Sequence, residues 1–101
     1  MRPNHEIRPT AIIAGNDIMA LGARQAIYDA GLGIPNDIAI TGYDDIFVSS
    51  ISGIDLTTVA VPRFRMGSLG AELLMKKIED PELSEIQQII LEPELVIRKT
   101  C

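Results

Sequence analysis

The sequence predicts an α/β fold built on a parallel strand–helix–strand unit. An apolar run at residues 10–14 is followed by a helical pattern that extends to residue 30, and a second apolar run follows at residues 38–41. Two strands joined through one helix by short turns pair in parallel. The 101 residues suffice for one domain, and a hydrophobic fraction of 47% with only 4% aromatic residues predicts a mostly aliphatic core.

The first helix is expected to begin at Asn16 or Asp17, because either side chain can cap the first N–H groups, and to end at Gly31. One stripe at helical spacing is expected to face the sheet: Met19, Ala23, Ala26, Ile27 and Ala30. A second stripe is mixed in character, and it fits core packing, a solvated edge or a subunit interface. Its members are Ile18, Leu21, Gln25 and Tyr28.

The rest of the chain predicts three strands and one helix. Residues 56–61 are β-rich and stop at Pro62, and a helix is expected over residues 63–79. Strands are expected at residues 87–91 and 95–98. The predicted helix has an apolar stripe formed by Met66, Leu69, Gly70, Leu73, Leu74 and Ile78.

Composition argues against several classes of function. The formal net charge is −5 and the nine basic residues are scattered, so direct nucleic-acid binding by this chain is not expected. No apolar run reaches the roughly 18 residues of a membrane span, and the polar start of the chain does not resemble a signal peptide. A cytoplasmic location is therefore expected. The single histidine, His5, and the single cysteine, Cys101, provide no catalytic set, zinc site or cofactor site.

The sequence Gly42-Tyr43-Asp44-Asp45 directly follows the second apolar run. It places carboxylates at the carboxyl end of a parallel strand, which is where open α/β sheets bind small ligands. Carboxylates accept hydrogen bonds from hydroxyl groups, so the position suits a sugar. Two alternatives are a turn in which Asp44 bonds its own backbone and a Mg²⁺-dependent phosphatase site that uses Asp44 and Asp45.

Six segments in order resemble LacI/GalR-type transcriptional regulators. The first of them reads PTAIIAGNDIMALG, and the resemblance extends from about residue 8 to residue 101. The segments are residues 9–22, 31–38, 42–45, 56–59, 66–67 and 95–98.

The resemblance implies a partial periplasmic-binding-protein-like (type I) fold, in which an effector lies between two α/β lobes. Residues 1–60 would form part of the C-terminal lobe, residues 61–91 would supply a helix and a strand to the N-terminal lobe, and residues 92–101 would return to the C-terminal lobe. The DNA-binding segment of such regulators is missing from this sequence, so contact with DNA would come only through that segment.

The resemblance also assigns roles to individual residues. Asn16 and Asp44 match positions that hydrogen-bond the effector, although Asn16 equally fits a helix cap. Val61 departs from the pattern, because some members have a cleft-lining glutamine there. Leu21 and Tyr28 match the helix by which such cores pair, which favours an interface for the stripe that also contains Ile18 and Gln25.

The leading hypothesis is the effector-binding and dimerisation part of a sugar-responsive regulator, without enzyme activity. The alternative is a fragment of a transport-type sugar-binding protein with the same fold. We expect a homo-oligomer, with a dimer as the favoured state, in which the helix at 63–79 or the strand at 95–98 could be exchanged. Affinity for the sugar is expected to be weak or absent, because half a cleft buries little of a ligand.

Overall fold

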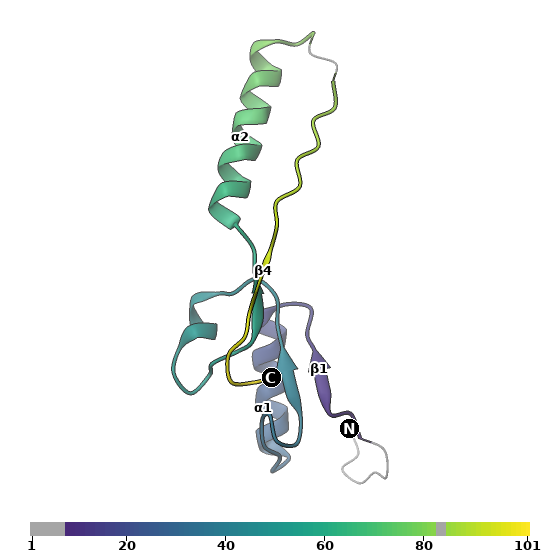
Figure 1. The fold of residues 1–101 in the computed structure, drawn as a ribbon, viewed down its shortest axis with the longest axis vertical. Helices are drawn as coiled ribbons and strands as arrows, with labels where there is room; N and C mark the ends of the chain where they lie inside the picture. The colour runs from purple at the N-terminus through teal and green to yellow at the C-terminus, as the bar shows by residue number, and fades with distance from the viewer. Residues whose placement is uncertain (1–7, 83–84) are drawn as a thin grey trace. The chain divides into compact units, whose positions relative to one another are not determined.

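The computed structural model describes residues 8–82 and 85–101 (Figure 1). The chain forms two compact units, one containing the chain up to Ala60 together with Glu94–Cys101 and the other containing Val61–Pro93. His5 and the rest of the polar start before residue 8 lie outside the described residues. The assignment of residues 1–60, 61–91 and 92–101 to the lobes of a two-lobed core stays a prediction.

A parallel pair of strands opens the first unit. Strand β1 (Ala11–Ile13) pairs with β2 (Ala39–Thr41), and Ile13 lies opposite Thr41. The pairing continues one residue beyond β1, where the Ala14 N–H donates to the Thr41 carbonyl at 2.9 Å. Helix α1 (Asp17–Asp29) connects the two strands, so the predicted parallel strand–helix–strand unit is confirmed.

The ends of α1 follow from its capping residues. Asn16 is the N-cap, and its Oδ1 atom accepts a hydrogen bond from the Met19 N–H at 2.8 Å. Such a bond satisfies one of the N–H groups that the first turn leaves without a helical partner. Gly31 follows the helix with φ of 76°, a conformation that glycine adopts without a steric penalty.

The core of the first unit lies between α1 and the strands. Its buried apolar side chains are Ala20, Ile27, Ile38, Ile40 and Leu56. The predicted sheet-facing stripe of α1 is therefore wrong in part, because Met19, Ala26 and Ala30 are exposed while Ala23 and Ile27 pack inward. Alanines occur all around this helix, so apolarity does not define its inner face. The buried residues Asp17, Ala20 and Ile27 define the inner face instead.

The last two strands of the first unit are antiparallel. Strand β3 (Thr58–Ala60) pairs with β4 (Glu94–Val96), and Thr58 lies opposite Val96. The strand predicted at residues 95–98 thus begins one residue earlier and ends at Val96. Isolated parallel bridges join Thr41 to Thr57 and Asp44 to Ala60, which places β3 beside the chain that continues from β2. A 3₁₀ helix, η1 (Phe47–Ser50), lies between β2 and β3.

The second unit contains helix α2 (Arg63–Glu79), whose bounds agree with the predicted helix. Lys76 and Lys77 lie in its last turn, where cations stabilise the negative end of the helix dipole. The predicted strand at residues 87–91 is wrong, because that segment is extended without being part of a strand. A strand needs a neighbour to accept and donate its backbone hydrogen bonds, and the described residues of this unit form no other strand.

The apolar stripe of α2 remains accessible. Within the described residues no side chain of α2 is buried, and Met66, Leu74 and Ile78 are at least half exposed. A small groove of about 210 Å³ lies between the helix and the extended return segment, with Leu73 and Ile86 among its lining residues. The stripe predicted from helical spacing is therefore present, but this unit covers only its edge.

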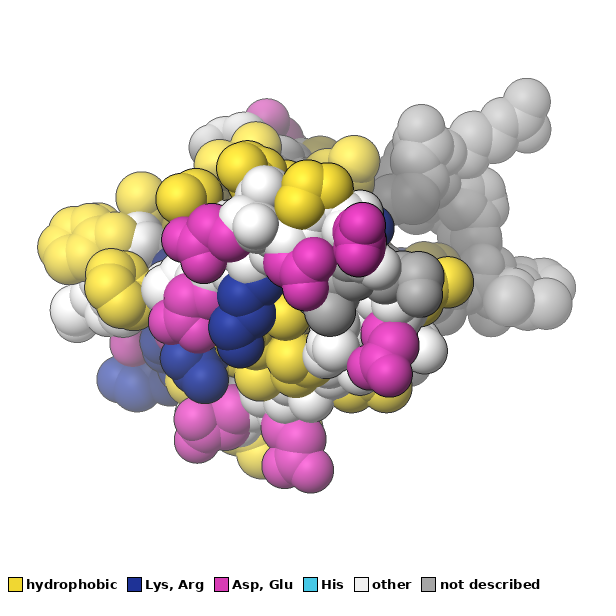
Figure 2. All heavy atoms as spheres, turned by 90° about the horizontal axis from the view of Figure 1, so that it is seen from above, with side chains coloured by type: hydrophobic (Ala, Val, Ile, Leu, Met, Phe, Trp, Pro, Cys, Tyr) yellow, Lys and Arg dark blue, Asp and Glu magenta, His cyan; other side chains and the backbone are white. Residues whose placement is uncertain are grey.

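The surface shows no broad basic area on the face in Figure 2, where acidic side chains are spread among hydrophobic ones and Lys and Arg form a small group. No helix within residues 8–82 and 85–101 combines the length and apolar character that crossing a membrane requires.

Candidate functional site

The carboxyl ends of β1 and β2 bring two predicted ligand residues to one edge of the sheet. Ile13 and Thr41 are the final, paired residues of these strands. Asn16 follows the first by three residues and Asp44 follows the second by three residues. The Asp17 N–H donates to the Tyr43 carbonyl at 3.0 Å, which joins the start of α1 directly to the turn that contains Asp44.

Asn16 has a demonstrated structural role, since its side-chain oxygen caps α1. The cap uses only the oxygen, and the amide NH₂ group of an asparagine carries two further N–H donors. A helix cap and a hydrogen bond donated to a ligand are therefore compatible in one side chain. The structure supports the first role and leaves the second as a prediction.

Asp44 and Asp45 form the second half of the turn at residues 42–45, which we call the acidic turn. Their φ angles are 117° and 56°, both in a region that side chains other than glycine rarely occupy. Such conformations cost about 1–3 kcal/mol each and persist only where surrounding contacts hold them. The Asp44 N–H donates to the Val59 carbonyl at 2.9 Å, which ties the turn to β3.

Asp45 belongs to an ion pair. Its Oδ1 atom lies 2.8 Å from the guanidinium of Arg98, whose side chain is mostly buried. The same guanidinium donates to the Leu56 carbonyl at 2.9 Å. Sequence reasoning assigned Arg98 to a strand and gave it no role, because no spacing rule relates two residues 53 positions apart.

A buried carboxylate lies beneath the acidic turn. Asp17 is completely buried, and its two oxygens accept hydrogen bonds from the hydroxyls of Ser49 and Thr58, each at 2.5 Å, and from the Ile46 N–H at 2.9 Å. These donors come from η1, from β3 and from the residue that follows the acidic turn. One side chain at the start of α1 thereby holds both β3 and the segment at residues 46–49.

The protonation state of Asp17 follows from this environment. Burial by itself raises the pKa of a carboxyl group, but the hydrogen bonds from Ser49, Thr58 and Ile46 favour the ionised form. Their combined effect outweighs burial and lowers the pKa of Asp17 below its usual value of 3.8. Asp17 is therefore an anion at neutral pH. The sequence analysis missed this role, because the donors lie 29 to 41 residues away.

The approach of Gly42 to Asp17 explains the glycine at the start of the acidic turn. A Cβ atom built on Gly42 would lie 2.3 Å from Asp17 Oδ1 and 3.1 Å from Asp17 Cα. No side chain fits at that separation, so the close packing of turn against helix requires glycine at this position. The first residue of the turn is thus set by the buried carboxylate.

The chemistry available at this edge is hydrogen bonding. Asn16 contributes an amide and Asp44 a carboxylate, and the exposed aromatic side chains of Tyr43 and Phe47 lie in the same loop region. Within the described residues, His, Cys, Asp and Glu form no group of three or more that could hold a metal ion. The Asp45 carboxylate is engaged by Arg98, a group that competes with a metal cation for the same oxygens.

The second predicted stripe of α1 is largely exposed. Ile18 is 65% exposed and Tyr28 is 45% exposed, while Leu21 is half-buried. Gln25 donates to Asp29 at 2.9 Å, and the Arg24 guanidinium lies 5.0 Å from the centre of the Tyr28 ring. The four predicted interface residues thus share an accessible side of one helix, and their role in pairing stays a prediction.

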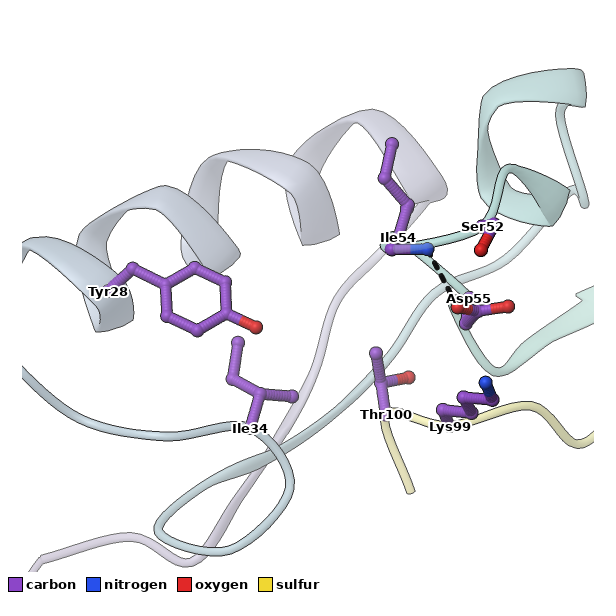
Figure 3. A pocket seen from close by; sticks show the side chains of 8 residues that line it. Tyr28, Ile34, Ser52, Ile54, Asp55, Lys99 and Thr100 are labelled. Atoms are coloured by element: carbon purple, nitrogen blue, oxygen red, sulfur yellow. Dashed lines mark hydrogen bonds between the residues drawn. The ribbon is translucent and has the colours of Figure 1, made fainter.

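A pocket of about 380 Å³ lies at the far end of α1 from Asn16 (Figure 3). The Tyr28 ring extends from the helix toward Ile34, and Ser52, Asp55 and Lys99 line the opposite side. Ile34 precedes β2, so this pocket is at the amino end of the strand and separate from the acidic turn. It adjoins the exposed α1 stripe through Tyr28.

Comparison with known proteins shows the family to which this chain belongs. All 101 residues match the family model described as a periplasmic binding protein-like domain, and the chain belongs to this family. It is 42% identical over 95 residues to the ribose operon repressor of Escherichia coli K12, covering 94% of this chain and 28% of that protein. It is 38% identical over 99 residues to an arabinose metabolism transcriptional repressor of Geobacillus stearothermophilus, covering 98% of this chain and 27% of that protein.

Solved structures agree with this assignment. A LacI family regulator from Enterococcus faecalis with bound ribose matches with a TM-score of 0.85 and 34% identity, covering 94% of this chain and 35% of that one. A putative LacI regulator from Bacillus cereus matches with a TM-score of 0.89 and 33% identity, covering 96% of this chain and 34% of that one. The predicted LacI-type effector-core fold is thereby confirmed. The chain spans less than a third of the length of these curated relatives.

Proposed function

We propose that this chain is the effector-binding and dimerisation portion of a sugar-responsive transcriptional regulator, and that Asn16 and Asp44 hydrogen-bond the sugar. The observation that carries the proposal is the equal placement of these residues three positions beyond two paired parallel strands. In this geometry an amide donor and a carboxylate acceptor can address neighbouring hydroxyls of one ring. A pentose is the class that we favour, because the relatives include ribose and arabinose repressors.

The other parts of the proposal follow from the same relatives. Proteins named as repressors support a binding role over catalysis and over the transport-type alternative. For a chain with this role we expect a cytoplasmic location. Contact with DNA would come from a segment outside these 101 residues, in keeping with the net charge of −5. Pairing of two copies would use the α1 stripe of Ile18, Leu21, Gln25 and Tyr28.

The direct test is a titration of the ¹⁵N-labelled chain with D-ribose, followed by NMR. We expect a Kd of about 1 mM or weaker, equivalent to no more than about 4 kcal/mol, since only one side of a cleft contributes. The shifted amides should surround Asn16 and Asp44. Asp44→Asn should weaken binding about tenfold through the loss of a charge-assisted hydrogen bond, while the half-buried control Asp37→Asn should not.

A chimaera extends the test to a complete cleft. Here the chain replaces the matching segment of the E. coli ribose operon repressor, to which it is 42% identical. We expect calorimetry to show ribose binding at least about 100-fold tighter than that of the 101-residue chain, because a second wall buries the rest of the ligand. If the chimaera folds but binds none of ribose, arabinose, sucrose and cellobiose, the proposal fails.

A further inference from the structure

We propose that Arg98 is a positioning residue for the acidic turn: by holding Asp45 and the Leu56 carbonyl at once, it fixes the backbone from which Asp44 reaches a sugar hydroxyl. The inference rests on the proposed function, since it concerns how strongly the same site binds. Arg98 acts through Asp45 in this scheme and is not itself assigned a ligand contact.

The geometry of Arg98 makes it a bridge between segments. One guanidinium nitrogen donates to Asp45 Oδ1 at 2.8 Å and the other donates to the Leu56 carbonyl at 2.9 Å. The Arg98 backbone N–H donates to Thr57 Oγ1 at 2.8 Å. A planar guanidinium can serve two acceptors in fixed directions, which a lysine ammonium does less well. The side chain is 18% exposed, so water competes little for these bonds.

The acidic turn requires such support. Asp44 and Asp45 both have positive φ, and a free turn would relax toward more common conformations. Asp17 holds the turn on one side through Tyr43 and Ile46, and Arg98 holds it on the other through Asp45. Without Arg98, the backbone that carries Asp44 would lose one of its restraints, and binding of the sugar would have to order the turn.

The support also comes from a separate part of the chain. Arg98 lies two residues beyond β4, the strand on which the chain returns to the first unit. The direction of Asp44 therefore depends on a segment more than 50 residues away in sequence. A change in the path of the chain at β4 would reach the ligand turn through the Arg98 side chain, in addition to the backbone bonds between the turn and β3.

Hydrogen exchange of the ligand-free 101-residue chain tests the positioning directly. In Arg98→Met, we expect the Asp44 and Ile46 amides to exchange about tenfold faster, because the loss of a charge-assisted contact lowers the cost of opening the turn. The Ala14 amide, which bonds Thr41 across the sheet, should change by less than about twofold if the fold is intact. Arg98→Lys should recover part of the protection. Arg8→Met is the matched control, because it removes an exposed ion pair with Asp37 that lies outside the turn.

The same variants are then titrated with D-ribose by NMR. We expect Arg98→Met to raise the Kd about tenfold, Arg98→Lys to raise it by less, and Arg8→Met to change it by less than about twofold. Should Arg98→Met fail to fold, Asp45→Asn removes the charged acceptor, keeps the Leu56 contact, and is expected to shift exchange and Kd in the same direction.

The outcomes separate the two proposals. Unchanged exchange at Asp44 and Ile46 in both Arg98→Met and Asp45→Asn overturns the positioning role, whether or not ribose binds. Faster exchange with an unchanged ribose Kd also overturns it, because the turn would then move without consequence for the ligand. If the native chain and the chimaera bind no sugar while exchange rises as expected, the positioning of the turn is supported and the proposed function is the part that fails.

Discussion

The carboxylate of Asp17 and the hydroxyl of Thr58 lie 2.5 Å apart across 41 residues of sequence. Both groups are buried, so the contact joins the start of α1 to β3 inside the first unit. Because Ser49 and Ile46 donate to the same carboxylate, the segment after the acidic turn is held by this one side chain. The ligand residues of the proposed site thus depend on a group that the ligand does not reach.

The acid stability of the chain should depend on Asp17. A carboxyl group whose pKa is lower in the folded than in the unfolded chain stabilises the fold above its unfolded pKa, and this contribution is lost as the pH falls through the folded pKa. The pH range in which the contribution of Asp17 to stability is lost therefore begins near pH 4 and extends downward. In Asp17→Asn, urea denaturation at pH 7 should show a loss of about 2 kcal/mol or more, since buried donors lose a charged acceptor.

The pH profile provides the contrast for this prediction. Between pH 5 and pH 2, the free energy of unfolding of Asp17→Asn should fall less steeply than that of the native chain, by up to about 1.4 kcal/mol per pH unit. Asp29→Asn, which changes an exposed carboxylate on the same helix, is the control variant for this comparison. Parallel profiles for Asp17→Asn and the native chain would contradict the assignment of a lowered pKa to this residue.

Gly42→Ala should destabilise the chain by about 1–3 kcal/mol, as overpacking does in close-packed interiors. The added methyl would meet the Asp17 carboxylate and its Cα atom, so the turn and the helix would have to separate. Gly22→Ala is the matched control, since nothing lies within 4 Å of the added atom and the residue is inside α1. Alanine there should stabilise the helix by up to about 1 kcal/mol. Equal chemical denaturation midpoints for the two variants would refute the close-approach explanation.

Two substitutions separate the capping and ligand roles of Asn16. Serine is also a good N-cap, so Asn16→Ser should retain the stability of the chain to within about 0.5 kcal/mol, whereas Asn16→Ala should lose about 1 kcal/mol. Both variants lack the amide N–H donors, so both should weaken ribose binding by NMR to a similar extent. A ribose affinity that follows stability, intact in Asn16→Ser and reduced in Asn16→Ala, would show that Asn16 is only a cap.

Pairing of two copies is expected to respond to Leu21. Leu21→Arg changes a half-buried position on the α1 stripe. It should raise the dimer dissociation constant at least about tenfold, as substitutions at the centre of interfaces do. Sedimentation velocity at micromolar concentration measures the change. Phe64→Arg on α2 is the control, because Phe64 is 91% exposed and outside the stripe. If Phe64→Arg dissociates the dimer and Leu21→Arg does not, pairing or exchange through α2 is favoured instead. A native chain that is monomeric would refute pairing through either helix.

Local signals predicted the elements whose ends depend on nearby residues. The α1 N-terminus follows from Asn16, and α2 lies between Pro62 and Asp80, so their bounds could be predicted. The parallel pairing of β1 with β2 follows from chain order and the short turns. The ligand candidates Asn16 and Asp44 could be placed at one edge because parallel strands share their carboxyl ends.

The features that were missed depend on distant contacts. A strand expected at residues 87–91 has no neighbour in its unit, and the inner face of α1 was misplaced because it includes the polar residue Asp17, which apolar spacing does not identify. The Asp45–Arg98 ion pair and the hydroxyl donors to Asp17 join segments separated by 32 to 53 residues. No local pattern of charge or polarity identifies such partners.

Thr100 has a consequence for the order of events during synthesis. Its hydroxyl donates to the Ile40 carbonyl and accepts from the Thr57 N–H, both at 2.8 Å, and its own carbonyl accepts from the Ile40 N–H at 2.9 Å. These bonds lie along β2, inside a unit most of which is translated early. Domains fold during translation as soon as their residues emerge. This unit cannot complete these bonds until Thr100 has left the ribosome, so a nascent chain that ends before Thr100 would retain unpaired backbone groups at Ile40.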